Sequence, residues 1–349
     1  MYIKIAFSIR TFVLCREQDV FITRFYKWRC TIEARIAINC SEMGMMMNKQ
    51  IKGIFPIVAT PFTDEGDVDE DSFQQLVRHL VGTGVNGLTL FGIASEFYKL
   101  ADEEKLRLQT ILLSETGKHA DVVGMISITD HARELAVQRA VKAEQMGADS
   151  LMLLPPFFLS PSREAIIAHI EAVASAVKIP IVVQYAPNQT GVRIPADTFI
   201  HINERHDHVQ FVKTETQPPG RYISQLVEGS AGRLSALIGY AGIQMPDAFK
   251  RGACGVQPGC SFSEIYVQLY QWHSSGQMDL FHDLFQRLLP YISYWMQGSE
   301  IIIKAEKTIL KKRGIIASDY CRQPAYTLDS IEMEMIEAFL NTFSSYLRM

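Results

Sequence analysis

From residue 51 onward, the chain alternates apolar stretches of strand length with amphipathic stretches of helical length. The strand-like stretches are residues 53–60, 85–92, 121–128, 149–155, 179–186, 208–215, 234–241 and 254–260. The helix-like stretches between the first five of them are residues 69–84, 102–117, 131–147 and 162–177. Several of these begin with Asp or Ser and end at Gly, as capped helices do. The alternation predicts an α/β fold, a parallel (β/α)8 TIM barrel.

The pattern changes after the eighth strand-like stretch. Residues 278–297, 299–314 and 327–349 have helical patterns with no strand-like stretch between them. We therefore expect the barrel to occupy residues 47–276 and a C-terminal helical extension to occupy residues 277–349.

Residues 1–46 show neither a helical nor a strand pattern. They hold three of the six cysteines and seven basic against four acidic residues, and several methionines close the segment. The acidic residues and the scarcity of serine disfavour a transit peptide. We interpret the segment as an extension outside the fold, added by an upstream start; a genuine extension is the alternative.

A doubly wound nucleotide-binding sheet is the rival fold. Residues 82–87, GTGVNG, match the glycine spacing of a dinucleotide-binding loop. They close a helix and precede a strand, whereas that loop follows a strand and opens a helix, so the match fails in its context. The HDH triplet at 206–208 enters a strand from its N-terminal side, away from the catalytic face of a barrel, and we expect no metal there.

The composition of the chain limits which partners and which cellular compartment are expected. A formal charge of −4 gives no basic surface for nucleic acid, and no apolar run is long enough to cross a bilayer. Cys254, Cys260 and Cys321 show neither CxxC nor zinc-site spacing, which favours core thiols in a reduced, cytoplasmic compartment.

The stretch 208–215 places a lysine inside a strand pattern. Lys213 stands near the C-terminal end of this stretch, where barrel enzymes place their chemistry, and Glu215 follows on the same face. A solvated strand end with an incidental ion pair is one interpretation. The other is a nucleophile, because burial disfavours the charged form of a lysine and leaves an amine that can attack a ketone.

Five motifs occur along the barrel pattern in a fixed order. They are KGIFPIVATPFTDEGDVDEDSF (52–73), FGIASEF (91–97), LLPPFF (153–158), APNQTG (186–191) and VKTE (212–215). Together they resemble the dihydrodipicolinate synthase / N-acetylneuraminate lyase family of class I aldolases. The resemblance implies a Schiff base between Lys213 and the keto carbon of a 2-oxo acid, no cofactor, and a homo-oligomer, commonly a tetramer.

The resemblance also implies further site residues. The loop that holds the substrate carboxylate in the family matches residues 92–96, so Ala94 and Ser95 are the expected donors. Gln184 and Gly239 are the other expected substrate-binding residues. Tyr185 is a third catalytic candidate beside Lys213 and Glu215.

Several positions depart from the family pattern. Ile93 and Ala94 replace two loop threonines, Phe158 replaces a loop tyrosine, and Gln189 replaces an arginine that binds the aldehyde's carboxylate in the synthases. The strand tyrosine is shifted by one position to Tyr185, which turns it to the opposite face of the strand. The usual proton relay is therefore expected to be missing, and Glu215 is its expected replacement.

The KTE and QYAP motifs are similar to the 2-keto-3-deoxy-L-arabonate dehydratase branch of the family. We therefore expect a Schiff-base lyase that dehydrates or cleaves a 2-keto-3-deoxy sugar acid. Synthase-type condensation of pyruvate and a catalytically silent sugar-acid-binding barrel are the alternatives.

Overall fold

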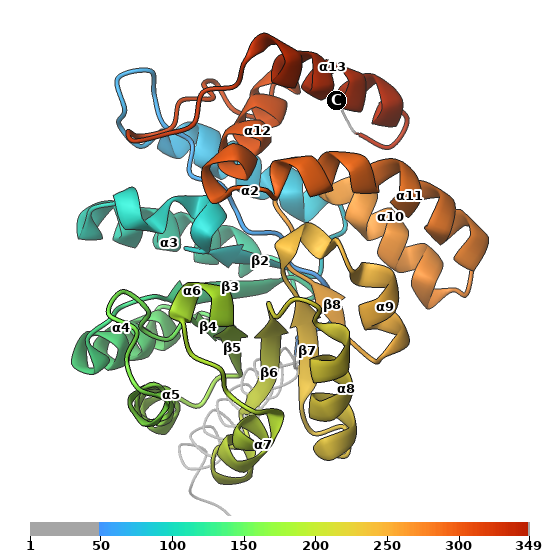
Figure 1. Cartoon of the computed structure of the whole chain (residues 1–349). Coiled ribbons are helices and arrows are strands. Elements are labelled where there is room, and N and C mark those ends of the chain that lie inside the picture. Colours follow the sequence, from blue (N-terminus) through green and yellow to red (C-terminus); the bar gives the residue numbers. More distant parts are fainter. Residues whose placement is uncertain (1–48, 348–349) are drawn as a thin grey trace, which may run out of the picture. The chain divides into compact units, whose positions relative to one another are not determined.

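Eight parallel strands form a barrel in the computed structural model, which describes residues 49–347 (Figure 1). The strands are β1 (Gly53–Ile54), β2 (Gly87–Leu90), β3 (Val123–Ile128), β4 (Ser150–Leu153), β5 (Ile181–Tyr185), β6 (Val209–Thr214), β7 (Ser235–Ile238) and β8 (Gly255–Val256). They pair in the order β1-β8-β7-β6-β5-β4-β3-β2. A bridge between Ile57 and Thr89 joins the two ends, so the predicted (β/α)8 barrel is confirmed.

The first and last strands are shorter than the sequence pattern predicted. Strand β1 ends before Pro56 and β8 ends before Pro258, because proline has no N–H to donate to a ladder. The chain nevertheless stays extended beyond both, since Ile57 N–H donates to the Pro258 carbonyl at 2.8 Å.

The strands are apolar on both faces, which is why they show little alternation in sequence. One set of side chains fills the barrel interior, and it includes Phe55, Met125, Met152, Val182 and Leu237. The alternate set packs outward against the surrounding helices. Side-chain parity along a strand therefore decides whether a residue can reach the interior.

Helices surround the barrel and connect its strands. They are α2 (Glu70–Gly82), α3 (Asp102–Thr116), α4 (Arg133–Gln145), α5 (Arg163–Ala176), α6 (Pro187–Thr190), α7 (Ala196–Arg205), α8 (Gly220–Gly229), α9 (Met245–Lys250) and α10 (Ser263–Ser274). Asp69 caps α2 and Ser162 caps α5 through their side chains, as the sequence suggested. Among helices of the described chain, none is long and apolar enough to cross a membrane.

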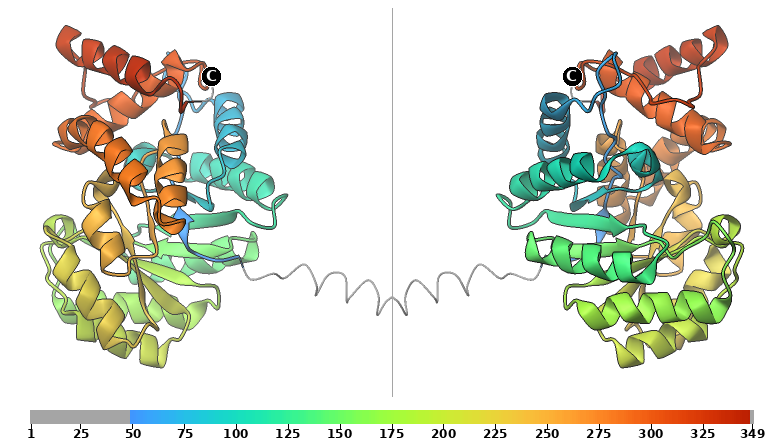
Figure 2. Two further views of the ribbon diagram at one scale, coloured as in Figure 1. Left: turned by 90° about the vertical axis from the view of Figure 1, so that its right-hand side faces the viewer. Right: turned by 90° about the vertical axis from the view of Figure 1, so that its left-hand side faces the viewer.

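Three helices follow the barrel: α11 (Met278–Trp295), α12 (Ser299–Lys312) and α13 (Ser330–Phe343). Figures 1 and 2 show them gathered on one side of the barrel, with α11 beside α10. Aromatic rings hold α13 in place, because Phe339 packs against both Phe262 and Trp295. The proposed boundary at residues 276 and 277 falls between α10 and α11. The proposed extension, residues 1–46, lies outside the described residues.

Helix α12 is tied to the barrel by a buried ion pair. Lys307 Nζ pairs with the carboxylate of Glu96, in the loop after β2, and both side chains are fully buried. Lys99 Nζ lies 3.2 Å from the second oxygen of Glu96. The Lys307 ammonium also lies 4.2 Å from the centre of the Phe62 ring. These contacts fix the loop after β2 against the C-terminal helices.

Replacing Lys307 by methionine should destabilise the fold strongly. The variant leaves the Glu96 charge buried beside Lys99 alone, and breaking a buried pair typically costs about 3 to 5 kcal/mol. Urea denaturation of the Lys307→Met variant should show a loss of about 3 kcal/mol in the free energy of unfolding.

The matched control is an exposed ion pair, Arg233 with Glu204, whose charged groups lie 3.3 Å apart. Arg233→Met should change the free energy of unfolding by no more than about 0.5 kcal/mol. If the two variants lose similar amounts of unfolding free energy, the buried Glu96–Lys307 pair contributes no more to stability than an exposed pair.

Candidate active site

Lys213 lies inside the mouth of the barrel, on β6. It pairs in register with Gln184 of β5 and Leu237 of β7, and the residue is only 5% exposed. Its Nζ atom lies 3.4 Å from Oε1 of Glu215, which is 8% exposed. The structure thus brings the predicted lysine and carboxylate together, away from bulk solvent.

Two further predicted residues fix the position of the Glu215 carboxylate. Gln184 Nε2 donates a hydrogen bond of 2.5 Å to Glu215 Oε2. Gly239, at the end of β7, leaves the space that the carboxylate occupies, because a Cβ atom there would lie 2.1 Å from Glu215 Oε1. Gly239 therefore acts here by making room for Glu215.

A cavity of about 190 Å³ surrounds these groups. Its walls come from the loops at the C-terminal ends of the strands and from the turn between α11 and α12. The lining residues are Ile57, Ile93, Ala94, Gln184, Lys213, Glu215, Tyr240, Ala241, Gln257, Pro258, Gly259, Met296, Gln297, Gly298, Ser299 and Ile302. Lys213 and Glu215 are the only charged residues among them. A buried amine beside a carboxylate can perform nucleophilic addition and proton transfer.

The loop after β2 contributes less than the sequence suggested. Ala94 borders the cavity, but Ser95 does not. The Ser95 hydroxyl donates to the Val58 carbonyl at 2.6 Å and accepts from Phe91 N–H at 3.1 Å. Its own N–H donates to the Gly92 carbonyl. The donors expected of Ser95 are thus already used in holding the loop to the barrel.

Tyr185 does not reach the cavity. Its ring stacks on Tyr222 of α8 and contacts Phe199 of α7, on the outer face of β5. Its hydroxyl accepts a hydrogen bond of 3.0 Å from Ile194 N–H. Burial raises the pKa of this hydroxyl, which favours its neutral form. This outward position agrees with the sequence prediction that the strand tyrosine, shifted by one residue, faces the opposite side of the strand. Tyr185 therefore makes no contact with Lys213.

Sequence reasoning missed three parts of the cavity wall. Tyr240 follows β7 with a positive φ of 48°, a strained conformation for a tyrosine. Gln257 directly follows β8. A polar residue at an inward-facing position of an apolar stretch is a signal that could have identified it as part of the site. The turn at 296–299 joins two helices far along the chain, and nothing local marks it as part of the site.

The loop after β8 is held by a buried carboxylate of α12. Glu306 Oε2 accepts a hydrogen bond of 2.7 Å from Ser261 N–H. Its Oε1 atom lies where a side chain on Gly259 would be, and no hydrogen-bond donor of the described chain reaches it. Burial raises the pKa of Glu306 to about 7. Glu306 thus packs against Gly259, a residue of the cavity wall, on the side away from the cavity.

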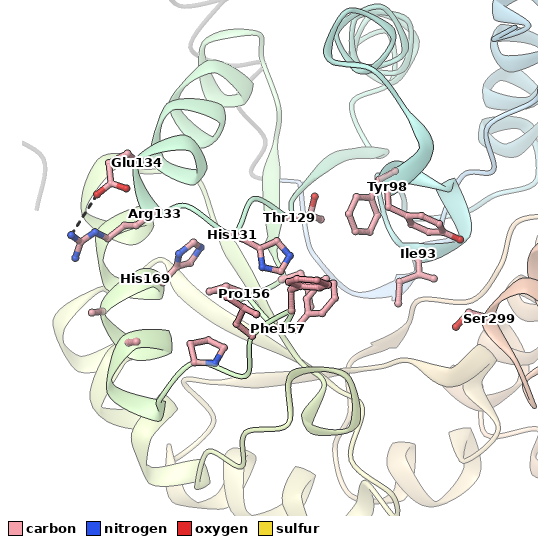
Figure 3. Close-up of a pocket in the computed structure, with 17 residues that line it drawn as sticks. Ile93, Tyr98, Thr129, His131, Arg133, Glu134, Pro156, Phe157, His169 and Ser299 are labelled. Atoms are coloured by element: carbon pink, nitrogen blue, oxygen red, sulfur yellow. Dashed lines mark ion pairs between the residues drawn. The ribbon is translucent and has the colours of Figure 1, made fainter. Parts of the chain in front are cut away.

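A larger and mainly apolar pocket of about 1010 Å³ lies next to the Lys213 cavity (Figure 3). Ile93 and Ser299 line both. Figure 3 shows His131 and Phe157 together in this pocket, with their ring centres 4.8 Å apart. Phe158 and Leu159 also line it and are 80% and 84% exposed. Neither Lys213 nor Glu215 borders this pocket, so the buried lysine–carboxylate pair identifies the smaller cavity as the candidate site.

Metal-ligating side chains do not cluster within residues 49–347: no group of three or more His, Cys, Asp or Glu residues there could hold an ion.

Comparison with known proteins gives one consistent family. The model of the "Dihydrodipicolinate synthetase family" matches residues 50–342. An L-2-keto-3-deoxyarabonate dehydratase of Azospirillum brasilense is 27% identical over 78% of this chain and 88% of its own length. A 4-hydroxy-tetrahydrodipicolinate synthase of Methanopyrus kandleri is 26% identical over 74% and 86%. The crystal structure of dihydrodipicolinate synthase from Rhodopseudomonas palustris is 26% identical, covers 85% of this chain and 98% of its own, and gives a TM-score of 0.76.

The buried carboxyl of Glu306 should make stability depend on pH. From pH 4.5 to about 7, the folded protein keeps a proton on Glu306 that the unfolded chain releases. The contribution of Glu306 to the free energy of unfolding therefore falls as pH rises through this window and is lost above it. Relative to Glu306→Gln, the native protein should lose about 3 kcal/mol between pH 4.5 and pH 8, measured by urea denaturation.

Glu334→Gln is the matched control, because its carboxyl is exposed on α13. This variant should follow the native pH dependence. If Glu306→Gln also follows the native curve, the Glu306 carboxyl does not hold its proton in the folded state.

Proposed function

The chain belongs to the dihydrodipicolinate synthetase family, a family of lyases, and we propose that Lys213 forms a Schiff base with the keto carbon of a 2-oxo acid. The reaction we propose is dehydration of a 2-keto-3-deoxy sugar acid, with retro-aldol cleavage of the same class of acid as the alternative. The observation that carries the proposal is the Lys213–Glu215 pair, with 3.4 Å between Nζ and Oε1 in a buried cavity.

Schiff-base formation requires a neutral amine. Glu215 is placed to accept a proton from the Lys213 ammonium, after which the amine attacks C2 of the 2-oxo acid. The resulting carbinolamine takes that proton back on its hydroxyl and loses water, which leaves an iminium ion. We propose that the substrate carboxylate lies against the loop at Ile93 and Ala94, which border the cavity.

Elimination then needs one group that first removes and later returns a proton. The iminium withdraws electrons from C3, so the Glu215 carboxylate can remove a C3 proton to give an enamine. The protonated Glu215 returns this proton to the C4 hydroxyl, which leaves as water, and hydrolysis of the unsaturated iminium frees Lys213. Gln184 holds Glu215 in place through the hydrogen bond to Oε2. This series of reaction steps needs no tyrosine, in agreement with the outward position of Tyr185.

The charge of the cavity favours this class of substrate over synthase chemistry. A second, carboxylate-bearing aldehyde would need a cation besides the lysine that forms the imine, and Lys213 is the only cation among the lining residues. The cavity is also lined by the polar residues Tyr240, Gln257, Gln297 and Ser299. Their side chains can form hydrogen bonds with the hydroxyl groups of a substrate. The dehydratase of A. brasilense among the relatives supports this choice, whereas the synthase of M. kandleri keeps pyruvate condensation as the second candidate.

A catalytically silent barrel that only binds a sugar acid is the remaining alternative. It would retain the cavity and the imine but give no turnover, so the experiments below separate it from an enzyme.

We also propose that the protein is a cytoplasmic homo-oligomer, a tetramer by its resemblance to the family. Phe158 and Leu159 are large apolar side chains that lie almost fully exposed in the monomer. Cys254, Cys260 and Cys321 carry free thiols, which suits a reducing compartment.

Lys213 should be the lysine that borohydride links to the substrate. Incubation with pyruvate or 2-keto-3-deoxyarabonate, followed by borohydride, should add one substrate mass, and peptide mapping should locate it on Lys213. Glu215→Gln should form the imine more slowly but still give the trapped adduct after long incubation, because the nucleophile Lys213 is intact. It should lower turnover by about 10²- to 10⁴-fold, the usual range for general acid–base catalysis. Tyr185→Phe is the matched control and should cost much less, because it lies outside the cavity.

An adduct on another lysine would exclude the proposed nucleophile. Trapping without turnover of any 2-keto-3-deoxy acid would favour the silent barrel. If Tyr185→Phe abolishes turnover while Glu215→Gln remains near normal, the proton-transfer role belongs to Tyr185.

Phe158 should contribute to self-association. A charge in an apolar contact is costly, so Phe158→Glu should shift sedimentation velocity profiles from the oligomer to a smaller species. Ile331→Glu, which changes an apolar residue of α13 that is 68% exposed, is the control and should keep the native profile. A monomeric native protein, or an unchanged Phe158→Glu oligomer, would contradict the proposal.

A further inference from the structure

Within residues 49–347, the buried amide oxygen of Gln257 has no hydrogen-bond partner. Its backbone N–H donates to the Ile238 carbonyl at 2.8 Å, which extends the β8 pairing by one residue. Side chains alternate between the two faces of a strand, and that of Gln257 faces the barrel interior. There it lines the cavity of Lys213 and Glu215, and the residue is only 2% exposed. A polar side chain this deeply buried is normally hydrogen-bonded at both ends of its amide.

The amide nitrogen of Gln257 is well satisfied. Nε2 donates to Thr89 Oγ1 at 3.0 Å and lies 3.4 Å from Met125 Sδ. Thr89 itself donates to Met125 Sδ at 3.6 Å, so its oxygen is left to accept from Gln257. Thr89 also belongs to the bridge that closes the barrel. In this arrangement the nitrogen end of the amide is anchored and Oε1 is the other end.

The amide oxygen lacks any such partner. No donor of the part of the chain that the structure describes reaches Gln257 Oε1. Leaving a buried acceptor unpaired is unfavourable, so a donor from a molecule in the cavity would be stabilised there. An amide oxygen accepts only, which means that the missing partner must carry an O–H or N–H group.

We propose that Gln257 Oε1 accepts a hydrogen bond from a chain hydroxyl of the bound 2-oxo acid and makes the site selective for hydroxylated acids. This inference rests on the proposed function, because it assumes that the acid binds at Lys213. The carboxylate and keto groups common to all 2-oxo acids are acceptors and cannot satisfy Gln257. A hydroxyl on the carbon chain can, and pyruvate has none. Gln257 is thus a specificity-determining residue that distinguishes a sugar acid from the unsubstituted acid.

The test compares two 2-oxo acids on the same variant. Gln257→Met keeps the length of the side chain and removes the acceptor. Borohydride trapping is measured over a range of concentrations of pyruvate and of 2-keto-3-deoxyarabonate. Loss of one neutral hydrogen bond should raise the half-saturating concentration of the hydroxylated acid by about fivefold, while that of pyruvate changes by less than about twofold.

Gln109→Met is the matched control. Gln109 is another buried glutamine whose amide contacts a methionine sulfur, Met146 Sδ at 3.3 Å, but it lies on α3 outside the cavity. This variant should leave both half-saturating concentrations unchanged. Thr89→Val provides a second variant, because it removes the anchor of the amide and should reduce the same preference even if Gln257→Met folds poorly.

The outcomes separate this inference from the function on which it rests. If the native protein traps neither acid on Lys213, the proposed Schiff-base function fails. If the native protein traps both, but Gln257→Met and Thr89→Val weaken pyruvate and the hydroxylated acid equally, the role of Gln257 is only structural and the inference is overturned.

Discussion

Two consecutive residues of α12 hold two separate loops of the barrel mouth. Lys307 pairs with Glu96 in the loop after β2, and Glu306 accepts a hydrogen bond from Ser261 in the loop after β8. Both loops border the cavity of Lys213. Neighbouring positions on a helix point in different directions, which lets one turn reach both loops at once. The walls of the site therefore depend on the C-terminal helices as much as on the barrel.

Inside the barrel, strand parity decides which groups can act together. Gln184 and Tyr185 are adjacent in the chain, yet one contacts Glu215 and the other packs among the outer helices. The same alternation brings Lys213 and Glu215 to one side, two residues apart. An amine and a carboxylate are thus brought together at the end of one strand, and an amide from the neighbouring strand contacts the carboxylate.

The parts of the fold and site that were predictable depend on local sequence. Strand and helix periodicity located the barrel, and the spacing of Lys213 and Glu215 follows directly from strand geometry. The function of Ser95 was not local, because its hydroxyl is taken by Val58, which lies 37 positions earlier. The turn at 296–299 reaches the cavity only through the packing of α11 and α12, and the short β1 and β8 follow from Pro56 and Pro258. Long-range partners explain the role of Ser95 and the position of the 296–299 turn, whereas the short strands follow from prolines that the sequence itself shows.

The lack of a side chain at Gly239 has an evolutionary consequence. Glu215 fills the volume that any larger residue at position 239 would need. A chain that drifts away from glycine there must shorten or move the carboxylate, and a chain that loses the carboxylate frees position 239 to vary. The two positions, which directly follow neighbouring strands, should therefore change together among homologues. Their joint pattern would mark which relatives place a carboxylate beside the strand lysine and which do not.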